Sequence, residues 1–89
     1  MNWSMNWDVR VSKSVKKRVK RFHKKDCERV LQVLNEFRIN PWGGDITKMD
    51  GKDNLWRRRV GNYRIFYSIQ VDARAVEVKE VERRTSSTY

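Results

Sequence analysis

The sequence predicts an α+β domain: a strand, two helices, then a three-stranded antiparallel meander, with the helices packed on one face of the sheet. Apolar residues recur at helical spacing in the first half and alternate in the second half. A Gly-Asn pair suited to a tight hairpin turn divides the alternating region. The 89 residues suffice for one small core, so we expect a single domain over 1–89.

The first half predicts one strand and two helices. "NWDVRV" (6–11) alternates apolar and polar residues, which is typical of a half-buried strand. Ser12 or Ser14 can cap a following helix within "SVKKRVKRFHKK" (14–25). Asp26 resembles a second N-cap. The apolar face expected of the second helix comprises Cys27, Val30, Leu31, Leu34 and Phe37.

The second half predicts sheet. Pro41 and the two glycines after Trp42 end the second helix in a loop, and 46–49 reads as a short extended piece before the turn "DGKDN". Two longer strands, 55–60 and 63–71, flank the Gly-Asn turn, and a third covers 75–81.

A two-residue turn fixes the register of this hairpin. Arg59 then lies opposite Arg64, and Arg57 lies opposite Phe66. Arg58 falls on the other, apolar face, so we expect its guanidinium to reach toward the sheet edge. That apolar face carries Trp56, Arg58, Val60, Tyr63, Ile65, Tyr67 and Ile69. A second two-residue turn at Asp72-Ala73 adds Val76 and Val78 to the apolar face, and Glu77, Lys79, Val81 and Arg83 to the arginine side.

The arginine cluster admits two interpretations. It is either the solvated surface of a basic protein, with Glu77 partly compensating, or a site for an oxyanion, because guanidinium groups bind phosphate in a bidentate manner. The net charge of +10 and the pI near 10.3 favour nucleic acid, an anionic membrane surface or an acidic protein as partner. No apolar run is long enough to span a bilayer, Cys27 is the single cysteine, and no signal peptide is evident, so we expect a cytoplasmic protein.

The hairpin resembles the RelE/ParE superfamily of toxins from toxin–antitoxin pairs. "WRRRVGNYRIFY" (56–67) matches that family's strand with tryptophan and spaced basic residues, its Gly-Asn turn and its following Tyr-Arg strand. "KMDG" (48–51) resembles the Lys-Leu-x-Gly that precedes this strand, and "VERRTSSTY" (81–89) resembles the basic C-terminal end with its tyrosine. The resemblance covers nearly the whole chain.

The resemblance implies a cytosolic toxin that an acidic antitoxin neutralises. We expect a partly disordered segment of this antitoxin to wrap the domain and to block or distort the arginine face. It also implies a metal-independent, cofactor-free cut of mRNA in the ribosomal A site, by attack of a ribose 2′-OH on the adjacent phosphate. Motif position implies a catalytic set of Arg57, Arg59, Arg64, Arg83 and Tyr89, with Tyr89 as the candidate base. Glu82 stands where some relatives carry histidine, and Arg84 competes with Arg83 for the late basic position. The RNA-binding residues expected are Lys16, Lys17, Lys20, Arg21, Lys48, Lys52, Phe66 and Arg84.

Alternatives remain at this point. A ParE-like toxin would inhibit DNA gyrase without catalysis, and an inactive relative would only bind nucleic acid. The basic first helix would either grip ribosomal RNA or keep the domain soluble. His23 and Cys27 are two residues compatible with one helix face, which is too few for a zinc site. We expect no membrane partner and no small-molecule substrate.

Overall fold

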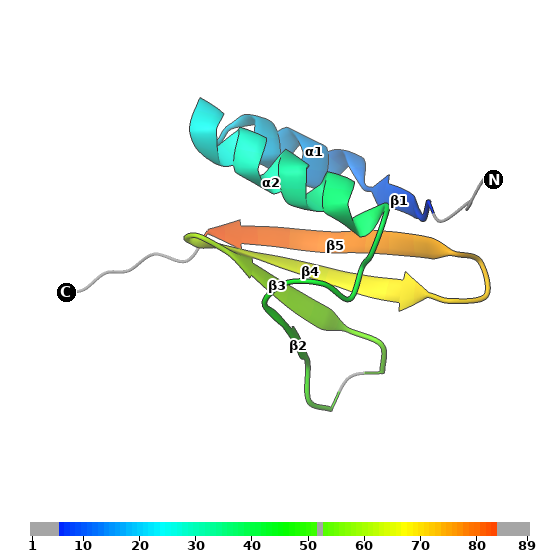
Figure 1. Ribbon diagram of the computed structural model, residues 1–89. Helices are drawn as coiled ribbons and strands as arrows, with labels where there is room; N and C mark the ends of the chain where they lie inside the picture. Colours follow the sequence, from blue (N-terminus) through cyan, green and yellow to red (C-terminus); the bar gives the residue numbers. More distant parts are fainter. Residues whose placement is uncertain (1–5, 52, 84–89) are drawn as a thin grey trace.

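Two helices cover one face of a five-stranded sheet in the computed structural model, which describes residues 6–51 and 53–83 (Figure 1). The elements are β1 (Asp8–Val11), α1 (Lys13–Lys20), α2 (Lys24–Phe37), β2 (Ile46–Lys48), β3 (Trp56–Val60), β4 (Tyr63–Gln70) and β5 (Ala75–Arg83). The spatial order of the strands is β1-β5-β4-β3-β2. The predicted α+β class and the strand, helix, helix, meander order are confirmed.

The two edges of the sheet are formed by its shortest strands. β2 pairs with β3 in antiparallel orientation, whereas β1 pairs with β5 in parallel, with Asp8 opposite Ala75 and Val11 opposite Val78. The helical hairpin is therefore the crossover that carries the chain back over the sheet. Placing β1 beside β5 requires contacts between distant parts of the chain, which local patterns do not reveal.

The predicted β3–β4 hairpin is confirmed pair by pair. Val60 lies opposite Tyr63, Arg59 opposite Arg64, and Arg57 opposite Phe66. The predicted second turn is also present, since the Arg74 N–H donates to the Val71 carbonyl at 3.1 Å. Side chains alternate across the strands, so one face of β3 and β4 packs under the helices and the other carries arginines.

The helix starts are partly as predicted. The Ser12 hydroxyl accepts from the Val15 N–H at 3.3 Å and caps α1. The first helix ends earlier than expected, at Lys20, and α2 begins at Lys24 with His23 at its N-cap position. Asp26 was therefore wrongly predicted as a cap: it lies in the first turn of α2, where its carboxylate is favoured by the helix dipole.

The core lies between the helices and the sheet. Val30, Val33, Leu34 and Phe37 are the buried residues of α2. Leu31, predicted on the buried face, is instead 52% exposed. The buried strand residues that meet the helices are Tyr63, Ile65, Tyr67, Ile69, Val76, Val78 and Val81.

A bulge in β5 overturns one prediction about the arginine side. Tyr67 pairs with Val78, but its neighbour Phe66 pairs with Glu80, so one extra residue, Lys79, is inserted in β5. Beyond this point, each β5 side chain points to the face opposite the one that it would take in a strand without the bulge. Val81 is consequently buried in the core opposite Ile65, whereas it was predicted on the arginine side.

Candidate functional site

The face of the sheet opposite the helices gathers three arginines on β3 and β4. We call this surface the arginine face and define it by Arg57 and Arg59 of β3, Arg64 and Phe66 of β4, and Glu82 of β5, together with Thr47, Ser68, Glu77 and Glu80. Arg57, Arg59 and Arg64 were predicted to share one face, and the register brings them together as predicted.

The three arginines differ in how far they are already engaged. The Arg59 Nε lies 3.9 Å from an Asp45 carboxylate oxygen, with half of the Arg59 side chain exposed. Arg64 lies directly across the hairpin from Arg59 and forms no hydrogen bond or ion pair with another described residue. The Arg57 Nε is buried and lacks a hydrogen-bond partner among the described residues. Arg59 and Arg64 therefore keep guanidinium N–H groups that can bind an anion, whereas the buried Arg57 Nε is closed to one.

Three glutamates of β5 lie on the same face as these arginines. Glu77 is 3.5 Å from the Lys79 ammonium group, and Glu80 is 3.9 Å from an Arg18 guanidinium nitrogen of α1. Glu82 lies opposite Arg64 and has no such partner among the described residues. The arginine face thus presents arginines on β3 and β4 and carboxylates on β5, rather than one uniform positive patch.

Arg83 does not belong to the arginine face, contrary to the prediction. After the bulge it pairs with Tyr63, on the side that faces the helices. The Tyr63 hydroxyl donates to the Asp26 carboxylate at 2.9 Å. Burial, and secondarily Asp26, raise the pKa of Tyr63, while the nearby charge of Arg83 lowers it. Arg83 therefore belongs to a cluster at the start of α2.

Arg58 lies on the helix-facing side as predicted, but its guanidinium turns inward rather than reaching open solvent. Its side chain is only 13% exposed, and it donates to the Gly43 carbonyl and to the Glu36 carboxylate, each at 3.1 Å. It thereby ties the loop after α2 to β3. Nearby, burial raises the pKa of Tyr67 to about 12, although the charge of Arg58 lowers it, and the Tyr67 hydroxyl donates to the Pro41 carbonyl.

The remaining predicted residues are scattered or outside the described ranges. The basic residues of the first helical region, Lys16, Lys17, Lys20 and Arg21, are all exposed. Lys48 is exposed but pairs with Trp56, so it lies on the face opposite Arg57. Phe66 is half-buried between the arginines of the hairpin. Lys52, Arg84 and Tyr89 lie outside the described residues.

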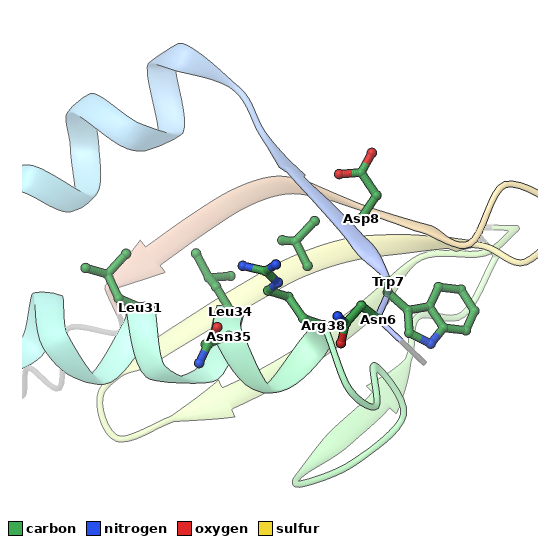
Figure 2. A pocket seen from close by; sticks show the side chains of 8 residues that line it. Asn6, Trp7, Asp8, Leu31, Leu34, Asn35 and Arg38 are labelled. Atoms are coloured by element: carbon green, nitrogen blue, oxygen red, sulfur yellow. The ribbon is translucent and has the colours of Figure 1, made fainter. Parts of the chain in front are cut away.

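A groove of about 540 Å³ runs between α2 and β1 on the helical side of the domain (Figure 2). Trp7 and Val9 line it from the β1 side, and Leu31, Leu34 and Arg38 line it from α2. A smaller apolar groove between α1 and α2 shares both leucines and is edged by Lys16 and Lys20. We call the two together the helical groove. The sequence indicated this groove, because α2 carries an apolar residue, Leu31, in addition to those that it buries in the core.

Three further observations bear on the chemistry. Within residues 6–51 and 53–83, no three His, Cys, Asp or Glu side chains group as metal ligands would. Cys27 is a free thiol beside the core. Neither described helix has the length and apolar content of a membrane span.

Comparisons with known proteins agree with this architecture. A family model described as the ParE toxin of the type II toxin–antitoxin system parDE matches residues 7–87. Toxin RelE1 of Methanocaldococcus jannaschii is 25% identical over 83 residues, covering 90% of this chain and 92% of that protein.

Solved structures share the fold. A chain of the archaeal RelE–RelB complex from Pyrococcus horikoshii OT3 matches with a TM-score of 0.80 at 24% identity, covering 93% of this chain and all of that one. A chain of the RelB–RelE antitoxin–toxin complex from Methanococcus jannaschii matches with a TM-score of 0.70 at 25% identity, covering 84% and 90%.

Proposed function

Because the chain belongs to the ParE toxin family of type II toxin–antitoxin systems, and so is a toxin of such a pair, we propose that it arrests translation by cutting mRNA in the ribosomal A site. The cut is a metal-independent transfer of the phosphoryl group to the neighbouring 2′-oxygen. Such a toxin works in the cytoplasm, where ribosomes translate.

The observation that carries this proposal is the convergence of Arg57, Arg59 and Arg64 on one sheet face. Arginine side chains this close repel one another across a β-ladder, so the arrangement costs stability. An mRNA phosphate relieves that repulsion by accepting charge-assisted hydrogen bonds from two guanidinium groups at once. Phe66, between Arg57 and Arg64 on this face, offers an aromatic ring for stacking a base.

The roles follow from position. Arg59 and Arg64, facing each other across the hairpin, hold the non-bridging phosphate oxygens and stabilise the charge that develops on them. Arg57, two residues before Arg59 on the same face of β3, orients the 2′-oxygen or supports the leaving 5′-oxygen. Arg84 and Tyr89 remain predictions for the C-terminal end, and the exposed basic residues of α1 are proposed to contact ribosomal RNA.

We also propose an acidic antitoxin as partner. Two of the structurally similar chains come from complexes of RelE with RelB. The helical groove suits an antitoxin segment that carries apolar side chains between acidic ones. Leu31, half exposed at its centre, gains burial against such a segment, and Lys16, Lys20 and Arg38 at its edges attract carboxylates.

Primer extension on a translated mRNA tests the nuclease. We expect cuts confined to translated codons with the wild-type protein. Arg64→Ala should lower the cleavage rate by about 100-fold to 1,000-fold, the range for losing one transition-state donor. Arg83→Ala is the matched control, because Arg83 faces the helices and should change the rate by far less. Arg84→Ala and Tyr89→Phe examine the C-terminal predictions. Equal cleavage by wild type and Arg64→Ala would refute the site.

A second candidate is inhibition of DNA gyrase without catalysis. The description of the matching family model, ParE of parDE, and the mixed charge of the arginine face favour it. Supercoiling by purified gyrase separates the two functions: loss of supercoiling with intact mRNA would select gyrase inhibition.

A further inference from the structure

We propose that Glu82 is the general base of the cleavage reaction, taking the proton from the attacking 2′-OH. This inference rests on the proposed nuclease function and adds a residue to its site. It arises from the bulge in β5, which turns Glu82 toward the arginine face and Arg83 away from it.

The position of Glu82 suits this role. Glu82 and Arg64 are direct partners across β4 and β5, and Arg59 follows on β3, so the three side chains form a row across the sheet. Directly opposed residues have Cβ atoms about 5 Å apart. A phosphate held by Arg59 and Arg64 therefore places its flanking ribose within reach of the Glu82 carboxylate.

The other described side chains of this face are poorer candidates. Arginine stays protonated and cannot accept a proton. Glu77 and Glu80 already lie near Lys79 and Arg18, whereas Glu82 has no hydrogen bond or ion pair among the described residues. Tyr63 and Tyr67 are buried on the opposite side of the sheet.

The Glu82 carboxylate accepts the 2′-OH proton while the 2′-oxygen forms a bond to phosphorus. The bond from phosphorus to the 5′-oxygen breaks, and that oxygen takes a proton from water. The products are a 2′,3′-cyclic phosphate and a free 5′-OH. The Glu82 carboxylic acid then returns its proton to the hydroxide left in the solvent.

The test is single-turnover cleavage of an mRNA bound in the A site of programmed ribosomes. A general base contributes about 10²-fold to 10⁴-fold, so Glu82→Gln should lower the rate constant at least 100-fold while binding to the ribosome is unchanged. Glu28→Gln, which alters an exposed carboxylate of α2 outside the arginine face, should change it less than about 3-fold. Thermal unfolding of each variant confirms the fold.

A second substrate separates base from acid. Replacing the 5′-oxygen by sulfur gives a leaving group that needs no proton, so it restores activity lost through a missing acid but not through a missing base. Glu82→Gln should stay slow on this substrate.

The outcomes are distinct. Unchanged cleavage by Glu82→Gln, with wild type active, would overturn the assignment. Faster cleavage would overturn it too and would make Glu82 a brake on phosphate binding. Recovery on the sulfur substrate would make it an acid. A wild-type protein that cleaves nothing would overturn the proposed function, and this inference with it.

Discussion

The buried hydroxyl of Tyr67 joins the sheet to the loop after α2, and its removal should show in stability. Tyr67 is fully buried, and its hydroxyl donates to the carbonyl of Pro41, also buried, at 2.9 Å. Tyr67→Phe keeps the ring but leaves that carbonyl without its donor. A net loss of about 1–2 kcal/mol is expected at pH 7, because buried polar groups without partners cost roughly that much.

The same substitution should reverse its effect at alkaline pH. Burial raises the pKa of Tyr67 to about 12, against about 10 in the unfolded chain. The folded state therefore holds the proton more tightly, and this stabilisation is complete below pH 10 and lost as the pH rises through 12. At pH 11, one unit above the pKa of Tyr67 in the unfolded chain, the free energy of unfolding has fallen by about 1.4 kcal/mol. The phenylalanine variant has no such loss, so the two stabilities should cross near pH 11.

Urea unfolding followed by tryptophan fluorescence at pH 7, 10 and 11 measures this difference. Ser68→Ala is the control, because Ser68 is a buried neighbour on β4 whose hydroxyl accepts from Gln70 and does not titrate. The difference between wild type and the control should not vary with pH. A constant difference between wild type and Tyr67→Phe from pH 7 to 11 would refute the argument.

Three further predictions concern other parts of the chain. Arg58→Met keeps the buried stem but loses two polar contacts, so the free energy of unfolding should fall by about 1–2 kcal/mol in urea titrations. Gly44→Ala should destabilise more than Gly51→Ala in the same assay: both have positive φ, but an added Cβ at Gly44 meets the Arg58 guanidinium and one at Gly51 meets nothing. In ribosome sedimentation, replacing Lys16 and Lys20 by glutamine should reduce the slope of log affinity against log salt by about 2 if both contact RNA phosphates, and an unchanged slope would exclude them.

The hairpin was predictable because two local constraints act together. A two-residue turn leaves one register, and alternation then assigns each side chain to a face. Arg57, Arg59 and Arg64 were placed correctly for this reason. Arg58 was placed on the right face, but its inward ion pair is with Glu36 of α2, 22 residues earlier in the chain, which spacing within a strand cannot reveal.

The errors arose where a local pattern had two physical solutions. Asp26 can cap a helix or lie in its first turn, and the structure has the second, with Tyr63 bonded to it. The parallel pairing of β1 with β5 depends on packing of the whole helical hairpin. The bulge, in contrast, left a trace: the apolar residues of the last strand fall at Val76, Val78 and then Val81, a spacing of two followed by three.

That spacing yields a last prediction, on which the placement of Glu82 depends. Deleting Lys79 removes the extra residue and restores strict alternation, with Val78 and Val81 toward the core and Glu82 still opposite Arg64. The deletion should therefore be tolerated, with a loss within about 1 kcal/mol, because it exchanges a bulge for regular pairing without changing any face.

Inserting one serine after Lys79 is the matched opposite change. It forces either a wider irregularity or a regular strand in which the serine faces the core and Glu82 is shifted past Arg64. It should destabilise by more than the deletion in the same urea titrations. If β5 instead continued in a regular register, the deletion would move Val81 from the arginine face into the core and Glu82 from the helix side to the arginine face. Cleavage would then depend on Glu82 only in the deletion variant. Retained stability, with cleavage that depends on Glu82 both with and without the deletion, is the result that the bulged strand requires.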